Sequence, residues 1–415
     1  MRIVLYVLVA LVAAGTTLVL SALIYRLSLR FRLYPTVRER DVHTRPTPRL
    51  GGVAMYLGVV IAFAVGAFIP QIHLVYAEPG KILAVLGAAT MIVVLGVADD
   101  IWDLDWMTKL AGQFLAAFLL AWQGVQIGVI PIPGGSLALI SPLMSLGATV
   151  FAVVLVMNAI NFIDGLDGLV AGVAIIANGV FFVYTYVISY GPTEQSDYFN
   201  LAALVTAVLI GACAGFLPYN WHPAKMFMGD AGSMLVGLLM ATSALAVTGQ
   251  IDPARITGDG VTDPNDLLGA SGLVPAFIPI ILPIAVLVIP LLDFSLAVFR
   301  RLRAGKSPFA ADRKHLHHRL LDMGHTHLTA VLLLYAWTAV ASIGCFLFLI
   351  VDWAWGLGFT LIGFVACTVA TLLPSNGRSR LAVLDEVLAA PDESLEETER
   401  TERTQRAASR GATGT

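Results

Sequence analysis

Acidic residues occur in three short clusters that interrupt an otherwise apolar sequence: ADDIWDLDWMTK, NAINFIDGLDG and PYNWHPAKMFMGDAGS. Ionisable groups this close to hydrocarbon are energetically costly and usually mark a functional site. Oxygen ligands favour Mg²⁺ or Mn²⁺ over zinc, and Mg²⁺ typically takes one or two carboxylates together with substrate phosphates. The clusters therefore predict a shared divalent-cation site. Its candidate residues are Asp99, Asp100, Asn161, Asp164, Asp167, Asn220 and Asp230.

A single aspartate at the start of a helix can also be an N-cap, and this interpretation fits Asp103 or Asp105 about as well as a metal site does. Capping does not explain the adjacent pair Asp99 and Asp100, which repel each other unless positive charge lies between them. Asp230, in the motif MGDAGS, comes at the start of an apolar segment, where exposed backbone N–H groups could face a phosphate.

Two basic segments accompany the acidic clusters. The first, DVHTRPTPRLGG (residues 41–52), carries Arg45 among prolines that stiffen the loop. The second, residues 300–327, contains five histidines within thirteen residues, more than a general bias toward cationic loops explains. With carboxylates elsewhere and no neighbouring cysteine, imidazoles and arginines facing an anionic phosphate are favoured over zinc. The predicted anion-binding residues are Arg45, His315, His317, His318 and Arg319.

Membrane helices must position these residues. Of the 415 residues, 58% are hydrophobic and 13% are charged, whereas about a quarter are charged in a soluble domain. Composition therefore excludes a water-soluble globular protein. A bilayer requires about 20 apolar residues per helix, which predicts an all-α polytopic protein of about eleven transmembrane helices. These lie at 3–25, 50–70, 81–98, 109–124, 145–161, 168–190, 199–217, 231–249, 272–298, 328–350 and 355–373.

The distribution of basic residues predicts the orientation. Of the 25 Lys and Arg residues, 22 fall on one side of the eleven predicted spans. The positive-inside rule then places the N-terminus outside and the C-terminus in the cytoplasm. With this orientation all three acidic clusters lie at cytoplasmic helix ends.

Three further segments have distinct compositions. Four prolines interrupt the ninth span and predict a kinked helix. Residues 125–144 contain a Pro-Gly-Gly turn between apolar pieces and predict a small external hairpin. Residues 1–373 are expected to form one integral membrane domain, and the charged residues 374–415 a disordered cytoplasmic tail.

Five motifs occur in this order between the predicted spans: DVHTRPTPRLGG, GVADDIWDLD, NAINFIDGLDGL, FMGDAGS and RKHLHHRL. Together they closely resemble the polyprenyl-phosphate N-acetylhexosamine-1-phosphate transferases, a superfamily that also contains phospho-N-acetylmuramoyl-pentapeptide transferase. The similarity covers roughly residues 35–330. Within this superfamily the chain is more similar to the UDP-GlcNAc:polyprenyl-phosphate GlcNAc-1-phosphate branch. Two features indicate this branch: the motif HLHH is followed by Arg319, and eleven rather than ten spans are predicted.

The resemblance implies Mg²⁺-dependent transfer of GlcNAc-1-phosphate from UDP-GlcNAc to a membrane polyprenyl phosphate, with release of UMP. This would be the first membrane step of a cell-envelope polysaccharide, in the inner (plasma) membrane, with the site facing the cytoplasm. By the same resemblance Asp230 is the leading metal ligand, with Asp99 and Asp100 next to the metal and the acceptor phosphate. Asn161 and Asp164 would contact the nucleotide. The resemblance also implies that Asp164 and Asp167 belong to the catalytic residues together with Asp99 and Asp100. It further implies that Asn220 supports the metal region and that His315 with its neighbours contacts the donor phosphates.

Several alternatives stay open from the sequence. The donor could carry MurNAc-pentapeptide, and a covalent aspartyl intermediate is an alternative to direct attack. DDIWD also fits the diphosphate motif of an intramembrane prenyltransferase, although that reading leaves the histidine-rich segment without a role. A transporter would be expected to show inverted repeats and sites at mid-bilayer. The oligomeric state is open, a homodimer included.

Overall fold

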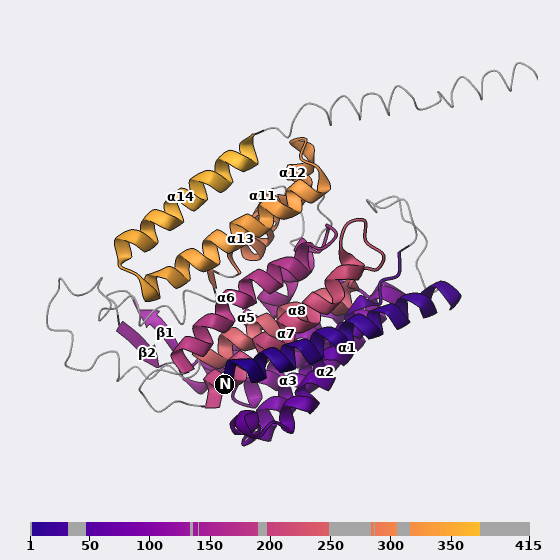
Figure 1. Cartoon of the computed structure of the whole chain (residues 1–415), viewed down its shortest axis with the longest axis vertical. Helices are drawn as coiled ribbons and strands as arrows, with labels where there is room; N and C mark the ends of the chain where they lie inside the picture. The colour runs from indigo at the N-terminus through magenta and orange to yellow at the C-terminus, as the bar shows by residue number, and fades with distance from the viewer. Residues whose placement is uncertain are drawn as a thin grey trace, which may run out of the picture.

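The computed structural model describes most of the chain as a bundle of long helices (Figure 1). The described residues are 2–31, 47–132, 136–139, 141–189, 197–248, 284–285, 287–303, 305 and 316–373. The all-α class predicted from the sequence is confirmed, because every long element in this part of the chain is a helix.

Eight described helices are long and apolar enough to cross a membrane. They are α1 (Arg2–Phe31), α3 (Pro79–Trp102), α5 (Pro142–Ile163), α6 (Leu169–Ser189), α7 (Asp197–Asn220), α8 (Gly229–Thr248), α13 (His327–Ile350) and α14 (Trp353–Leu372). Two shorter helices, α2 (Gly51–Ala67) and α4 (Trp106–Trp122), coincide with the predicted second and fourth spans. The chain is a multi-pass membrane protein, and the exact number of eleven spans stays a prediction.

The predicted ninth span, 272–298, lies mostly outside the described residues, and the predicted kink lies there too. Its described end belongs to α11 (Val288–Arg303), which continues beyond the predicted boundary and has three arginines in its last turn. The short helix α12 (Leu316–Asp322) follows. The tail predicted for residues 374–415 is also outside the described part.

The hairpin predicted in residues 125–144 is confirmed as two antiparallel strands. Strand β1 (Val129–Ile132) pairs with β2 (Ser136–Leu139), and Val129 lies opposite Leu139. Figure 1 shows this hairpin at one end of the bundle, while α12 lies at the other end. A 3₁₀ helix, η1 (Pro70–Tyr76), connects α2 to α3.

Helices α7 and α8 form the centre of the bundle. Helix α7 packs between α1 and α6, and α8 packs between α3 and α5. Small residues permit this close approach, as is usual between membrane helices: a methyl group at Gly96 would overlap the backbone of Ala231, and one at Gly52 would overlap the backbone nitrogen of Gly232. The first turn of α8 is therefore held against α2 and α3.

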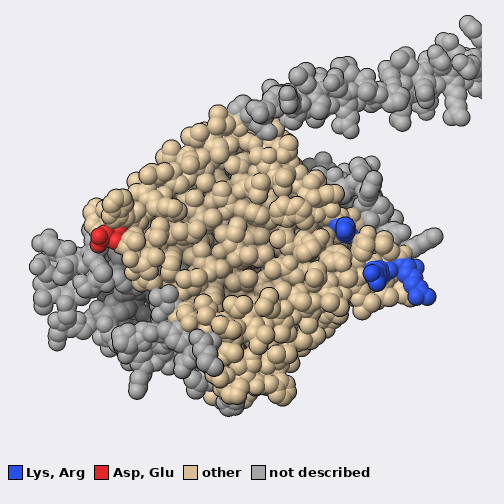
Figure 2. Space-filling view, in the orientation of Figure 1, with Lys and Arg blue, Asp and Glu red and all other residues tan. Residues whose placement is uncertain are grey.

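The outer surface is apolar. Large hydrophobic side chains of α1 and α14 are exposed, among them Val19, Ile362 and Val365. The face in Figure 2 shows a broad area without charged side chains, with basic atoms toward one end and acidic atoms at the opposite end. This pattern suits a surface surrounded by lipid.

Candidate active site

The first turn of α8 is fixed by backbone hydrogen bonds to the segment that leads into α2. Phe227 N–H donates to the Pro48 carbonyl (2.9 Å), and Gly51 N–H donates to the Phe227 carbonyl (3.0 Å). Gly229 follows with φ +65°, a left-handed conformation that favours glycine, and a side chain there would overlap an Asp100 carboxyl oxygen. This tight junction places Asp230 at the helix N-terminus beside the end of α3.

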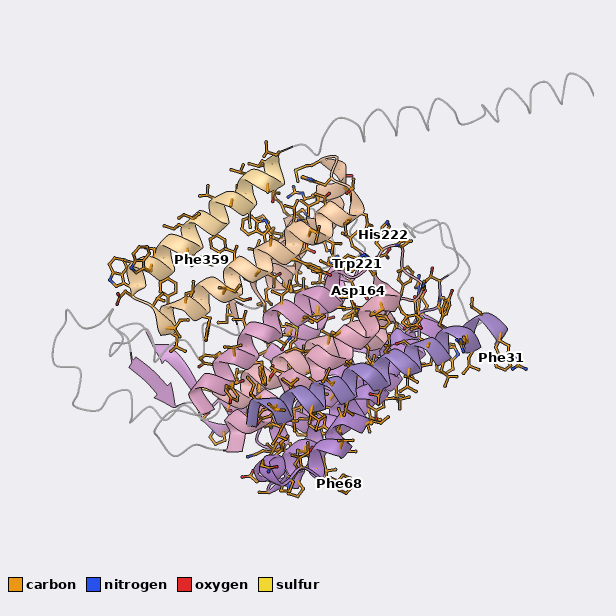
Figure 3. All side chains as sticks on the ribbon, viewed as in Figure 1. Phe31, Phe68, Asp164, Trp221, His222 and Phe359 are labelled. Atoms are coloured by element: carbon orange, nitrogen blue, oxygen red, sulfur yellow. The ribbon has the colours of Figure 1, made fainter. Side chains whose placement is uncertain are left out.

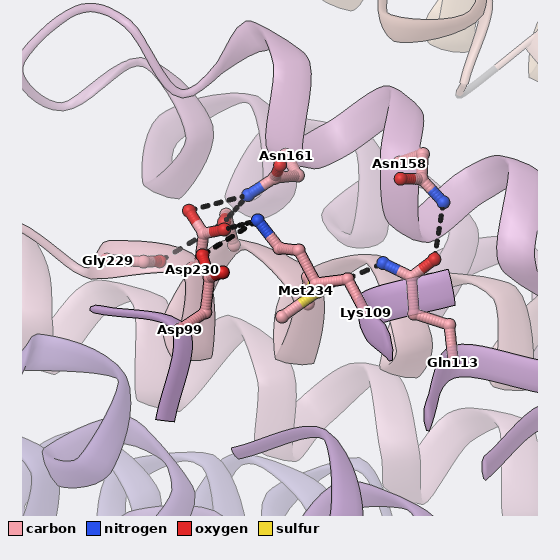
Figure 4. A network of polar contacts seen from close by, with 9 residues as sticks. Asp99, Lys109, Gln113, Asn158, Asn161, Gly229, Asp230 and Met234 are labelled. Carbon is pink, nitrogen blue, oxygen red and sulfur yellow. Dashed lines mark hydrogen bonds and ion pairs between the residues drawn. The ribbon is translucent and has the colours of Figure 1, made fainter. Parts of the chain in front are cut away.

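Asp230 is the centre of a polar network that joins four helices (Figure 4). Asn161 of α5 donates to one carboxyl oxygen of Asp230 (3.1 Å), and Lys109 of α4 donates to the other. Lys109 also pairs with Asp99 at the end of α3, at 2.8 Å. Asn161 additionally donates to Ser233 Oγ (2.8 Å), which in turn donates to the Gly229 carbonyl. Asp99, Asn161 and Asp230, all predicted site residues, therefore lie together.

Asp100 lies beside this network, with its Oδ2 atom against Gly229. That oxygen is buried and has no hydrogen-bond partner among the described residues. A buried carboxylate oxygen without a donor is costly. The arrangement therefore suits a ligand that brings positive charge to Asp100.

Among the described residues, negative charge exceeds positive charge around the site. Asp99, Asp100 and Asp230 are joined by Asp164 at the end of α5, whereas the described cations nearby are Lys109 and Arg49. Burial, followed by repulsion from Asp230 and Asp100, raises the pKa of Asp164 to about 8. A divalent cation would relieve this repulsion, so the residues present fit the predicted Mg²⁺.

Asp167 belongs to a second cluster, farther along the same loop. Its carboxyl group pairs with His222 Nδ1 (2.8 Å) and accepts from the Ala224 amide (3.1 Å). His222 stacks on His327, with ring centroids 4.2 Å apart and an interplanar angle of 18°. Ligand atoms of Asp167, His222 and His327 lie within 4.8 Å of one another. Because the two rings are nearly parallel, their nitrogen lone pairs do not converge, and the cluster is best described as a His–Asp pair covered by a second imidazole.

Asn220 connects the two loops that carry these clusters. Its side-chain oxygen accepts from the Gly168 amide (3.0 Å), and its side-chain nitrogen donates to the Met226 carbonyl (3.2 Å). Tyr335 of α13 donates to the Gly168 carbonyl at 2.5 Å. Asn220 is buried, and both the oxygen and the nitrogen of its side-chain amide are hydrogen-bonded to backbone groups. Its contact with a substrate stays a prediction. Figure 3 shows Asp164 and His222 at the end of the bundle opposite the hairpin.

The remaining predicted residues are placed only in part. Arg45 and His315 lie outside the described residues, and His317 and His318 are described only as helical positions of α12. Arg319 is exposed on α12. Their predicted contacts with phosphates remain predictions.

The two aspartates between α3 and α4, Asp103 and Asp105, are both exposed. Asp105 is the N-cap of α4 and accepts from the amides of Met107 and Thr108, both at 3.0 Å. Its hydrogen bonds with Thr108 hold the pKa of the exposed carboxyl below its usual value. Asp103 ends α3 in the left-handed conformation (φ 54°). The N-cap interpretation is thus confirmed for Asp105. It is wrong for Asp103, which lies at the C-terminal end of α3.

Lys109 was not among the predicted site residues, although it stands at the start of the predicted fourth span. It lies in the first turn of α4. The available signal was its position in ADDIWDLDWMTK, a single lysine close in sequence to the adjacent pair Asp99 and Asp100, which requires positive charge nearby. Gln113, one turn further along α4, was also missed.

Comparison with known proteins identifies the class. The model of glycosyl transferase family 4 matches residues 82–248, which hold most of the acidic network. A decaprenyl-phosphate N-acetylglucosaminephosphotransferase of Mycobacterium leprae is 41% identical over 342 residues, covering 81% of this chain and 82% of that protein. The chain belongs to glycosyl transferase family 4 and is an enzyme of the transferase class.

Two other relatives show the range of the similarity. A probable undecaprenyl-phosphate N-acetylglucosaminyl 1-phosphate transferase of Bacillus subtilis is 30% identical, over 77% of this chain and 78% of that protein. A phospho-N-acetylmuramoyl-pentapeptide-transferase of Desulforudis audaxviator is 34% identical over 58% of this chain and 77% of that protein. The superfamily predicted from the five motifs is confirmed.

Proposed function

We propose that this enzyme transfers N-acetylglucosamine 1-phosphate from UDP-GlcNAc to a polyprenyl phosphate in the membrane. The products are UMP and N-acetylglucosamine joined to the lipid by a diphosphate. The observation that carries the proposal is the convergence of Asp99, Asp100 and Asp230 with Lys109 at one end of an apolar helix bundle. The name of the 41% identical relative supports the sugar and the type of acceptor.

Asp230, with Asp99 and Asp100, would hold Mg²⁺. The bound ion would supply positive charge to the donor diphosphate. Two observations support this assignment: Oδ2 of Asp100 has no hydrogen-bond partner among the described residues, and burial together with repulsion from Asp230 and Asp100 raises the pKa of Asp164.

The protein's own cations would orient the phosphates. Lys109 lies between Asp99 and Asp230 and can turn one N–H toward a phosphate oxygen without leaving either carboxylate. The N-terminus of α8 offers backbone N–H groups at the same place. Such fixed donors stabilise negative charge that develops as phosphoryl groups move.

The acceptor needs little activation. The second pKa of a phosphate monoester is about 6, so a polyprenyl phosphate is mostly dianionic at neutral pH. Its oxygen can attack the sugar-linked phosphorus of the donor if the site holds the two in line. Asp99 is therefore not required as a base, although attack by an aspartate with a covalent intermediate remains an alternative.

The donor proposal is tested by substrate competition. Purified enzyme is given polyprenyl phosphate, Mg²⁺ and either UDP-GlcNAc or UDP-MurNAc-pentapeptide, and UMP release is measured. We expect turnover with UDP-GlcNAc alone, because the motif HLHH-Arg319 matches the branch that uses the compact sugar. Comparable rates with both donors would contradict the choice of donor and leave the superfamily unaffected.

The proposed setting is the inner (plasma) membrane, with the active site open to the cytoplasm. UDP-sugars are cytosolic, and the acidic network lies at the helix ends that the positive-inside rule places there. The product would begin a cell-envelope polysaccharide.

A further inference from the structure

A second polar layer lies one helical turn away from the acidic network and is seen beside it in Figure 4. Gln113 is four residues after Lys109 on α4, and Asn158 is three residues before Asn161 on α5. Residues three or four apart lie on one face of a helix. Each helix therefore contributes one side chain to the acidic network and another, one turn deeper, to the second layer.

The second layer is connected by hydrogen bonds between helices. Asn158 Nδ2 donates to Gln113 Oε1 (2.6 Å), and Gln113 Nε2 contacts Met234 Sδ at 3.1 Å. Gln113 is only 2% exposed, so its amide has no access to water. Met234 is four residues after Asp230, so the bridge ends on the helix that carries the central carboxylate. The second layer thus joins α4, α5 and α8.

A bridge of this kind is poorly explained by stability alone. A buried amide costs free energy unless it is hydrogen-bonded, and an apolar side chain at position 113 would avoid the cost. Hydrogen bonds between membrane helices also contribute only modestly to stability. They are directional, however, and fix the rotation and height of one helix relative to another.

We propose that Gln113 and Asn158 are positioning residues for the transfer reaction. Their amide bridge holds α4 against α5, so that Lys109 and Asn161, one turn above, converge on Asp230. The inference rests on the proposed function, because its effect is measured through sugar-phosphate transfer. A displacement of about 1 Å in such a site can reduce the rate about a hundredfold.

The test compares two asparagines on neighbouring helices, Asn158, which is partly buried, and Asn178, which is buried. Asn158 donates to Val154 O and Asn178 of α6 donates to Ala174 O, both at 2.8 Å and both to the carbonyl four residues earlier. Among the described residues, Asn158 also bonds to a side chain of another helix, that of Gln113, whereas Asn178 does not. We expect Asn158→Leu to lower kcat at least tenfold with KM for UDP-GlcNAc within about threefold, as for an interaction that acts on the transition state. Asn178→Leu should keep kcat within about twofold.

Exchanging the side chains of Gln113 and Asn158 tests whether the kcat lost in the single variants can be restored. Gln113→Asn combined with Asn158→Gln conserves the total length of the bridge, whereas each single change leaves a gap or an overlap. We expect the double variant to recover kcat to within about fivefold of wild type, and each single variant to remain lower. This coupling is expected only for residues that act through their contact.

The outcomes separate the two proposals. Wild-type enzyme that does not transfer GlcNAc-1-phosphate would overturn the proposed function, and this inference with it. Active wild type with Asn158→Leu and Asn178→Leu equally active would overturn the positioning role alone. If Asn158→Leu fails to fold, the exchange decides: recovery of the melting temperature without recovery of kcat would mean that the bridge is only structural.

Discussion

Asp230 is oriented before any ligand binds, because donors from two different helices reach its carboxylate. Lys109 approaches from α4 and Asn161 from α5, so neither oxygen is free to rotate away. A carboxylate held in this way loses little conformational freedom when a cation arrives. Asp230, Lys109 and Asn161 together form the central part of the proposed site.

Asp230→Asn removes the charge of the carboxylate and keeps its size. Asp230 is the second residue of α8, and its oxygens accept from Lys109 and Asn161. The asparagine oxygen can still accept the hydrogen bond from Asn161, so we expect the fold to be preserved. The negative charge that balances Lys109 and would hold Mg²⁺ is lost, and we expect turnover to fall by about a hundredfold or more. The measurement is UMP release by purified enzyme across a Mg²⁺ titration, together with the melting temperature. Activity within about threefold of wild type at ordinary Mg²⁺ would mean that Asp99 and Asp100 hold the cation.

Asp105→Asn is the matched control on the same side of the membrane. Its carboxylate caps α4 and is exposed, and asparagine can accept the same two amide hydrogen bonds. We expect activity within about twofold of wild type and an unchanged Mg²⁺ requirement. A large loss in the same UMP-release assay would show that the α3–α4 connection contributes more than a cap.

The chemical type of a residue was enough to predict some of the site. The direction of its side chain could not be read from the sequence. Adjacent Asp99 and Asp100 predicted a cation because like charges so close require compensation. Lys109 was missed because positive-inside bias already accounted for a lysine at that depth. Gln113 was missed because its partner Asn158 is 45 positions away in the sequence, and no local pattern predicts their contact.

The close contact between α3 and α8 sets the distance between the acidic pair and Asp230. Gly96 lies one turn before Asp99 and packs directly on the backbone of Ala231. No side chain can be added there without moving one helix. The small-residue contact is therefore as important for the site as the charged residues themselves.

Gly96→Ala should separate these two helices. The added methyl group overlaps backbone atoms that cannot rotate away, a change that typically costs about 1–3 kcal/mol. We expect a lower melting temperature and at least a tenfold loss of UMP release. Gly87→Ala, on the same helix, meets only the end of the Leu119 side chain at 3.1 Å. It should retain activity, and equal losses in both variants would contradict a specific role for the Gly96 contact.

Helices could be predicted wherever the length of an apolar segment is enough to determine that it spans the membrane. Ten of the eleven predicted spans coincide with a described helix, because an apolar run of sufficient length has few alternatives in a bilayer. The Pro-Gly-Gly turn correctly predicted the β1–β2 hairpin. Helix ends were less predictable: α4 begins at Trp106 instead of residue 109, because Asp105 caps it. Capping depends on hydrogen bonds that hydropathy does not measure.

For the whole molecule, the orientation in the membrane is a prediction that rests on 22 of 25 basic residues lying on one side of the predicted spans. Glu78→Cys, before α3, should react with a membrane-impermeant maleimide in intact cells. Met107→Cys, in the first turn of α4 and 62% exposed, should react only after permeabilisation. Each variant is compared with unmodified protein, in which Cys213 and Cys367 are buried and Cys345 is partly buried, so that any background labelling is subtracted. Labelling of position 107 from outside would place the acidic network on the wrong face.

The central claim is that the phosphate next to the sugar moves to the lipid together with the sugar. Purified enzyme is incubated with polyprenyl phosphate, Mg²⁺ and UDP-GlcNAc labelled with ³²P at the β-phosphate, and the lipid and aqueous phases are counted separately. We predict that the label enters the lipid phase, in equal amount to the UMP released, and that Asp230→Asn lowers both by about a hundredfold or more. Label that remains in the aqueous phase as UDP, while sugar enters the lipid, would mean simple glycosyl transfer and would contradict the account.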